Sequence, residues 1–204
     1  MADSAFAAGF ALRQRSPAAA RHSALVRVTH WVNTLSFFGL VISGFAILLA
    51  HPRFYWGETG NVGTPSLFDL PLPFVLTGQT GWGRSLHFLA AWVCVLNGLL
   101  YVVSGFAARH FREGQAAYNS AQRLAYMVVV FGLSPVMVWT GLAMSPAVTS
   151  VFPVLATWLG GQQSARTIHF AGADALFLFL LVHVTEVFRA GFVRHVRSMI
   201  TGRL

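Results

Sequence analysis

The sequence predicts an all-α integral membrane protein, a bundle of four transmembrane helices, and three observations support this fold class. Of the 204 residues, 55% are apolar and only 10% are charged, whereas soluble domains carry roughly 25% charged residues. Four apolar runs are each long enough to cross a hydrocarbon core of about 30 Å. Arginine is concentrated on one side of these runs. A water-soluble globule is therefore excluded, and the lipid bilayer is the expected surrounding of most of the chain.

The apolar runs define the spans in chain order. The first two runs contain no formal charge, the third begins near Arg123, and the fourth contains only Asp174 and Glu186. We expect spans at about residues 28–50, 85–108, 121–145 and 167–189. They divide the chain into an N-terminal tail (1–26), a membrane domain (27–192) and a C-terminal tail (193–204).

The positions of the arginines predict which side of the membrane each end occupies. Eleven of the 14 basic residues lie in the N-terminal segment, in the connection after the second span or at the C-terminus, and the other three are Arg53, Arg84 and Arg166. Because positive residues accumulate on the cytoplasmic side, both termini are expected in the cytoplasm and the chain is expected to be a multi-pass membrane protein. The net charge of +8 then reflects orientation in the bilayer, and no nucleic-acid partner is expected.

The outer connection, residues 51–83, is 33 residues long and contains six glycines and four prolines. Loops of this length are commonly functional. It is either a docking surface for a partner or a cap over the bundle.

Four of the eight histidines fall within the expected spans: His30, His87, His169 and His183. Intramembrane ionisable residues are candidates for function. His169 and His183 are 14 residues apart, so they share one helix face and lie ~21 Å apart along the axis. With the fourth span entering from outside, His87 is level with His169, and His30 is level with His183.

Two histidine pairs, each from facing helices at one depth, match the axial ligands of two stacked bis-histidine haems. Zinc is the weaker alternative, because its sites need three or four protein ligands. The single cysteine, Cys94, excludes an internal disulfide and any cysteine-based zinc or iron–sulfur site.

Glycines and arginines recur at helical spacing from these histidines. Gly44 follows His30 by 14 residues and Gly105 follows His87 by 18, so each lies near its own helix's histidine face at the depth of the other pair. Either glycine admits a haem edge or serves ordinary close helix packing. Three of the histidines have arginine at i−3, on the same face, where a guanidinium can pair with a haem propionate. These arginines are Arg27, Arg84 and Arg166.

The two acidic residues of the fourth span have open roles. Glu186 is either a proton carrier on the inner side or half of an ion pair with Arg189, three residues on. Asp174 either bonds within the bundle or meets a partner subunit.

Four segments together resemble a known family over about residues 20–200. They are Arg27-Val-Thr-His30-Trp31, His87-Phe-Leu-Ala-Ala-Trp92, Tyr118-Asn119-Ser-Ala-Gln122-Arg123, and His169 with His183. The chain is similar to the bacterial cytochrome b561 and nickel-hydrogenase cytochrome b group, and within it to the dihaem membrane subunits of formate dehydrogenase and hydrogenase.

The resemblance implies two haem b groups, the inner one held by His30 and His183. It implies an outer haem between His87 and His169, in agreement with the depths derived above. It also implies quinone contacts, to ubiquinone or menaquinone, from Asn119 and Gln122 on the inner side, although Asn119 before an apolar run is equally a helix cap. Ala121 replaces a glycine that the formate dehydrogenase subunit has between those polar residues.

The sequence thus predicts a cytochrome b that transfers electrons between an outer-face redox partner and a quinone near the cytoplasmic face. No motif for molybdenum, nickel or iron–sulfur binding is present, so substrate oxidation is expected in a separate catalytic or electron-carrier subunit. One rival is an autonomous superoxide-to-quinone oxidoreductase on the same fold. A rival of another class is a histidine-based transporter or proton channel.

Overall fold

The computed structural model describes residues 23–61, 63–72, 75, 80–107 and 120–202. Helices dominate it, with one short two-stranded sheet. The elements in chain order are α2 (Ala24–Ala50), β1 (Arg53–Phe54), β2 (Phe68–Asp69), α3 (Thr80–Ala107), α5 (Ser120–Met127), the π-helical turn η2 (Val128–Leu133), α6 (Ser134–Ala143), α7 (Pro146–Thr149), α8 (Val154–Thr157), α9 (Gln162–Arg189) and α10 (Phe192–Thr201).

Four helices in the described part of the chain are long and apolar enough to cross a membrane, as the sequence predicts. They are α2, α3, the continuous run of α5, η2 and α6, and α9. α2 begins earlier than expected, at Ala24, because the Ser23 side chain accepts a hydrogen bond from the Val26 backbone nitrogen. α9 also begins earlier, at Gln162, and the third span ends at Ala143.

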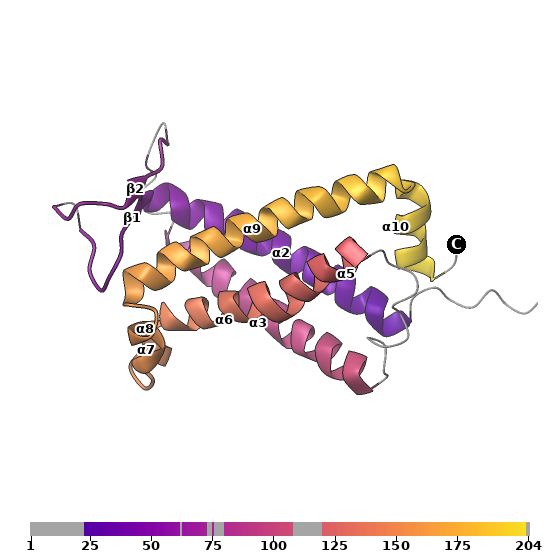
Figure 1. Ribbon diagram of the computed structural model, residues 1–204, viewed down its shortest axis with the longest axis horizontal. Coiled ribbons are helices and arrows are strands. Elements are labelled where there is room, and N and C mark those ends of the chain that lie inside the picture. Colours follow the sequence, from indigo (N-terminus) through magenta and orange to yellow (C-terminus); the bar gives the residue numbers. More distant parts are fainter. Residues whose placement is uncertain (1–22, 62, 73–74, 76–79, 108–119, 203–204) are drawn as a thin grey trace, which may run out of the picture.

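The spans pack as two antiparallel pairs, α2 with α3 and α6 with α9 (Figure 1). The β1–β2 sheet and the short helices α7 and α8 gather at one end of the bundle, which we call the loop end. α10 and the first turns of α2 lie at the opposite end, the tail end.

Small and polar residues line the contact between α2 and α3. Thr29, Ser36 and Ser43 recur every seven residues on α2, and all three are buried. An added Cβ on Gly83 of α3 would lie 3.3 Å from the Ala46 Cβ, so the backbones approach closely, as is typical of transmembrane helix pairs. The Asn97 side chain donates to the Thr29 carbonyl oxygen at 2.8 Å and so links α3 to the first turns of α2.

Large apolar side chains point away from these contacts. Leu35, Leu96 and Val103 are each more than half exposed, whereas the buried residues are mainly alanine, serine and threonine. This distribution, with large apolar groups outside and small residues inside, fits a protein whose surrounding solvent is lipid.

The third span contains a widened turn that follows from its proline. The Ser134 backbone nitrogen bonds to the Val129 carbonyl oxygen, five residues back, and the Ser134 hydroxyl donates to the same oxygen at 2.8 Å. The next residue, Pro135, has no N–H to donate. Proline and π-turns are the usual causes of irregular transmembrane helices, and here they occur together.

Residues 51–61 are fastened to the start of α9 by two glycines with positive φ. Gly57 has φ +102° and Gly161 has φ +116°, a region that favours glycine. The Gly57 carbonyl oxygen accepts from the backbone nitrogens of Gln163 and Ser164, two of the free donors of the α9 N-terminus. The Gly57 nitrogen in turn donates to the Ser164 hydroxyl at 2.8 Å.

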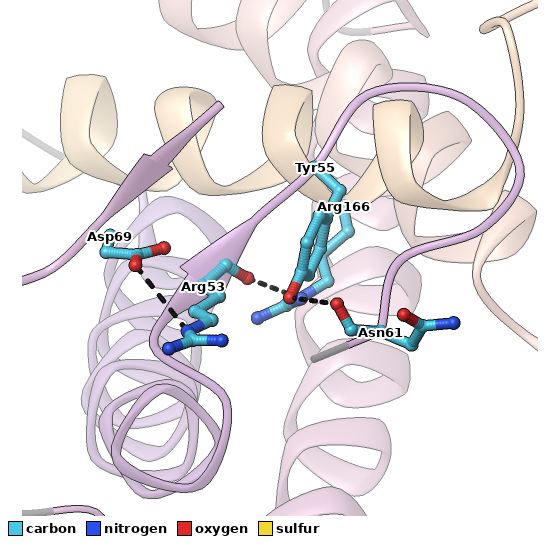
Figure 2. Close-up of polar contacts among 5 residues, drawn as sticks. All are labelled: Arg53, Tyr55, Asn61, Asp69 and Arg166. Atoms are coloured by element: carbon cyan, nitrogen blue, oxygen red, sulfur yellow. Dashed lines mark hydrogen bonds and ion pairs between the residues drawn. The ribbon is translucent and has the colours of Figure 1, made fainter. Parts of the chain in front are cut away.

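Aromatic and polar side chains complete this attachment (Figure 2). Phe54 is 1% exposed and packs against Phe68 and Phe170 with ring centres 4.7 and 4.4 Å away. The Tyr55 hydroxyl donates to the Asn61 carbonyl oxygen at 3.0 Å. The described part of the outer connection is therefore an ordered structure built on α9.

The C-terminal segment forms α10, which turns away from α9 across the tail end (Figure 1). The Trp31 indole nitrogen donates to the Met199 carbonyl oxygen at 3.1 Å. The Arg27 guanidinium donates to the Ile200 carbonyl oxygen at 2.8 Å. α10 is therefore anchored to the first turns of α2.

Candidate functional site

The structure brings His87 of α3 and His169 of α9 together between the two helix pairs. Their ring centres are 6.2 Å apart and their planes are inclined by 62°. These are the two histidines that the sequence places at one depth. The two rings belong to different helix pairs, so they approach the space between the pairs from opposite sides.

Each ring is fixed by a hydroxyl on the adjacent helix of its own pair. The Ser43 hydroxyl of α2 lies 3.0 Å from Nδ1 of His87, and the Thr140 hydroxyl of α6 lies 2.8 Å from Nδ1 of His169. Sequence reasoning missed both residues, although Ser43-Gly-Phe-Ala and Thr140-Gly-Leu-Ala repeat one motif. That repetition was the available signal.

The hydroxyl contacts favour one tautomer of each histidine. The Ser43 hydroxyl is placed to donate to the Gly39 carbonyl oxygen at 2.6 Å, and the Thr140 hydroxyl to the Val136 carbonyl oxygen at 2.8 Å. A hydroxyl has one proton to donate, so with these bonds made each oxygen accepts from the histidine Nδ1–H. Nε2 of both rings is then unprotonated and has the lone pair that a metal ligand needs.

A glycine lies against each ring on the same neighbouring helix. An added Cβ on Gly44 would lie 3.7 Å from Cε1 of His87, and one on Gly141 would lie 3.6 Å from Cε1 of His169. Gly44 was expected at this depth, whereas Gly141 was not identified from the sequence. Gly105 is buried in the last turns of α3, at the tail end.

The donor set fits a group that takes one axial ligand from each side. Two imidazoles bound to one metal ion from opposite sides, at about 2 Å each, hold their ring centres roughly 6 Å apart. The described residues contain no cluster of three or more histidine, cysteine or acidic side chains, which a zinc site would need. A bis-histidine haem therefore fits this pair better than zinc does.

The other two predicted histidines lie nearer the tail end. His30, on α2, makes an edge contact with Trp31 at 5.4 Å between ring centres. His183, on α9, stacks with Phe179 at 6.0 Å, and its Nδ1 lies 3.5 Å from the Tyr126 hydroxyl. These two histidines again come from different helix pairs. Tyr126 is a neighbour that sequence reasoning missed.

The three predicted arginines have distinct surroundings. The guanidinium of Arg27 bonds to the end of α10, as described above. The guanidinium of Arg166 donates to the carbonyl oxygen of Arg53 (Figure 2) and to that of His51. It lies 4.8 Å from the Phe54 ring centre. Arg84 and Arg166 both line a cavity of about 260 Å³ at the loop end.

His51 lines the same cavity at the end of α2. Burial lowers the pKa of His51, and the nearby guanidiniums of Arg166 and Arg84 lower it further. Both effects oppose protonation of the imidazole while no anion occupies the cavity.

The polar residues predicted to contact quinone are only partly visible. Asn119 lies outside the described residues, and of Gln122 only the backbone is described, in the first turn of α5. Glu186 forms an exposed ion pair with Arg189 at 3.4 Å, the simpler of its two predicted roles. Asp174 is exposed on α9.

Comparison with known proteins places these features in a family. Residues 21–202 match the family model described as prokaryotic cytochrome b561. The chain is 31% identical over 191 residues to the putative protein-methionine-sulfoxide reductase subunit YedZ1 of Azospira oryzae, covering 81% of this chain and 89% of that protein.

A second relative is the probable Ni/Fe-hydrogenase B-type cytochrome subunit of Cupriavidus necator. It is 26% identical over 207 residues, covering 82% of this chain and 78% of that protein. No solved structure matches the chain significantly. The family match covers all four membrane-spanning helices and all four histidines described above. The chain therefore belongs to the prokaryotic cytochrome b561 family, whose members are b-type membrane cytochromes that transfer electrons.

Proposed function

We propose that the chain is a dihaem cytochrome b that transfers electrons across the bilayer between a redox partner on the outer face and a quinone near the cytoplasmic face. The observation that supports it most strongly is the His87–His169 pair. Its ring centres lie 6.2 Å apart, and hydroxyl contacts at both Nδ1 atoms leave both Nε2 atoms available.

We assign the second haem to His30 and His183. Both lie nearer the tail end than the first pair, and they come from α2 and α9, so the two ligands belong to different helix pairs, as in the first site. The 14-residue spacing of His169 and His183 puts the two sites ~21 Å apart along α9. Tyr126, which lies beside His183, would fix that ring.

Bound at these sites, the haems supply two one-electron carriers. If each haem iron were held by two histidines, no coordination position would be open, and electron transfer would be favoured over ligand chemistry. The Ser43 and Thr140 hydroxyls orient the imidazole rings of His87 and His169, and the apolar helix faces exclude water from the site. Arg84 and Arg166 offer guanidinium groups for propionates at the outer site, and Arg27 offers one at the inner site.

We infer that the loop end faces outward and the tail end faces the cytoplasm of a bacterial inner membrane. The excess of arginine in the N-terminal segment, the second connection and the C-terminus supports this orientation. We place ubiquinone or menaquinone near Asn119 and Gln122, beside the haem held by His183. Protons for quinone reduction would then come from the cytoplasm.

The outer partner is proposed to be a catalytic or electron-carrier subunit. Both relatives are named as subunits, one of a methionine-sulfoxide reductase and one of a hydrogenase. At the loop end Trp56 is 60% exposed and Trp158 is 72% exposed. Exposed tryptophans are frequent anchors of protein interfaces, so we place the docking surface over residues 51–61 and the α8 turn.

The direct test is a reduced-minus-oxidised spectrum of the purified protein together with its haem content. Two b-type haems per chain are expected. A content of zero would instead favour a histidine-based transporter or channel, and a content of one would remove the transmembrane relay. Quinone reduction by superoxide with no partner subunit present would favour the autonomous oxidoreductase.

The hydroxyl of Thr140 gives a further expected result. Thr140→Val removes the oxygen that fixes His169 while preserving the shape of the side chain, whereas Thr140→Ser retains the oxygen. Loss of such an orienting bond typically weakens metal binding by about 10- to 100-fold. The valine variant should therefore release its outer haem faster to a haem scavenger, and the serine variant should behave as wild type. Equal release rates in both variants would show that the bond does not orient the ligand.

A further inference from the structure

The cavity at the loop end lies directly outward of the His87–His169 pair. Arg84 and Arg166 each precede one of these histidines by three residues, about one helical turn toward the loop end. Ile47 and Met144 also line the cavity. Each lies one turn after the glycine that contacts a histidine ring, Gly44 and Gly141 respectively. Each of the four spans therefore contributes to the cavity wall a residue that lies about one turn closer to the loop end than the His87–His169 pair.

The wall of this cavity is electropositive. It contains two guanidinium groups and the His51 imidazole, and none of the described residues that line it has a carboxylate. Of the two acidic residues in the loop, Asp69 is paired with Arg53 at 3.5 Å, and Glu58 lines a different cavity beside Gln162. An electropositive cavity lined by two guanidinium groups suits an anionic group such as a carboxylate.

We propose that this cavity receives the propionate carboxylates of the outer haem and that His51 binds a proton when that haem is reduced. The proposal rests on the proposed function, because it requires a haem between His87 and His169. It adds His51 to the outer site and makes the potential of that haem depend on pH.

The charges around His51 explain the direction of this coupling. The groups that face it are Arg84 from α3 and Arg166 from α9, and the Arg53–Asp69 pair adjoins it in the loop. The two guanidiniums keep the pKa of His51 low, whereas propionates would raise it. One electron added to the iron makes the site more negative by one charge and raises the pKa further. One proton from the outer solvent then binds the imidazole, so charge is balanced within the site.

His51 can be substituted without removing the loop attachment. Its backbone carbonyl oxygen, not its ring, accepts the hydrogen bond from Arg166. The side chain is exposed at the end of α2. His51→Gln removes the titrating group, and His51→Lys supplies a positive charge that does not titrate near neutral pH.

The experiment is a spectroelectrochemical titration of the full-length protein in lipid nanodiscs from mildly acidic to mildly alkaline pH. In the wild type, the potential of the outer haem should fall as pH rises through the range in which His51 titrates. The outer haem is the spectral component that is absent from His169→Ala. The potential should become independent of pH in both His51 variants, near the alkaline wild-type value in His51→Gln and near the acidic value in His51→Lys. His195→Gln, on α10 at the other end, should keep the wild-type dependence.

Different results would contradict different claims. If the wild type lacks two b-type haems, the proposed function fails. If it has both haems but the outer potential does not vary with pH, or varies equally in wild type and His51→Gln, the role of His51 is wrong while the proposed function stands.

Discussion

Replacing His169 by alanine is expected to lower the haem content from two per chain to one, by removing the outer haem alone. Nε2 of His87 would then face a site with no second ligand, and a bis-histidine haem needs both. Replacing His183 by alanine should remove only the inner haem. The two positions are ~21 Å apart on one helix, so neither substitution reaches the other site.

Haem content, the reduced-minus-oxidised spectrum and redox titration measure these losses. In each variant one potential should disappear and the other should stay near its wild-type value. His195→Ala is the matched control, because this histidine lies on α10 outside the spans, and it should retain both haems. Loss of the inner haem from His169→Ala, with the outer one retained, would show that the histidines are paired wrongly.

The spans and the histidine faces were predictable because they depend on simple lengths. A helix rises 1.5 Å per residue and the bilayer core has a fixed thickness. An apolar, uncharged run of sufficient length therefore predicts a membrane-spanning helix. The same periodicity places His169 and His183 on one face. The level of His87 followed from its distance to the end of its span, and the ring contact with His169 agrees with it.

The groups that orient the outer histidines were not predictable in the same way. Ser43 and Thr140 stand in a repeated motif, but small residues before glycine also suit plain helix packing. Whether Ser43 and Thr140 orient a histidine or only allow close packing depends on which helix lies beside each of them. That information comes from the α2–α3 and α6–α9 pairs in the structure. The repeated motif becomes informative once a histidine is known to face it.

The positions of the arginines relative to the histidines were predictable from the sequence, but their hydrogen-bond partners were not, because those partners are backbone groups far away in the chain. The i−3 spacing put Arg166 one turn outward of His169, and it does line the cavity there. Its bonds to the carbonyl oxygens of His51 and Arg53 connect residues more than 100 positions apart, which no local pattern reports. Similarly, Arg27 holds the end of α10. The π-turn is different, because Pro135 within an apolar run was a readable signal for it.

Replacing Gly161 by valine is expected to detach residues 51–61 from α9 and to destabilise the protein by roughly 3 kcal/mol or more. Gly161 has φ +116°, which a β-branched residue adopts only with strain. A Cβ at this position would also overlap the Gly57 carbonyl group and the Glu58 nitrogen. The backbone must move, and the bonds from Gln163 and Ser164 to the Gly57 oxygen are then lost.

Thermal unfolding in detergent and limited proteolysis measure this effect. The midpoint should fall, and new cleavage should appear within residues 51–61 under conditions in which the wild type resists. Gly98→Val is the matched control, because Gly98 lies in the interior of α3, with no neighbouring atoms within 4 Å of an added Cβ. Its midpoint should stay close to that of wild type. Equal midpoints for the two variants, without new cleavage in Gly161→Val, would show that the loop end does not depend on this glycine.

Because Arg166 bonds to the same loop, detachment of the loop should also alter the wall of the outer cavity. The outer haem should then become easier to remove than the inner one.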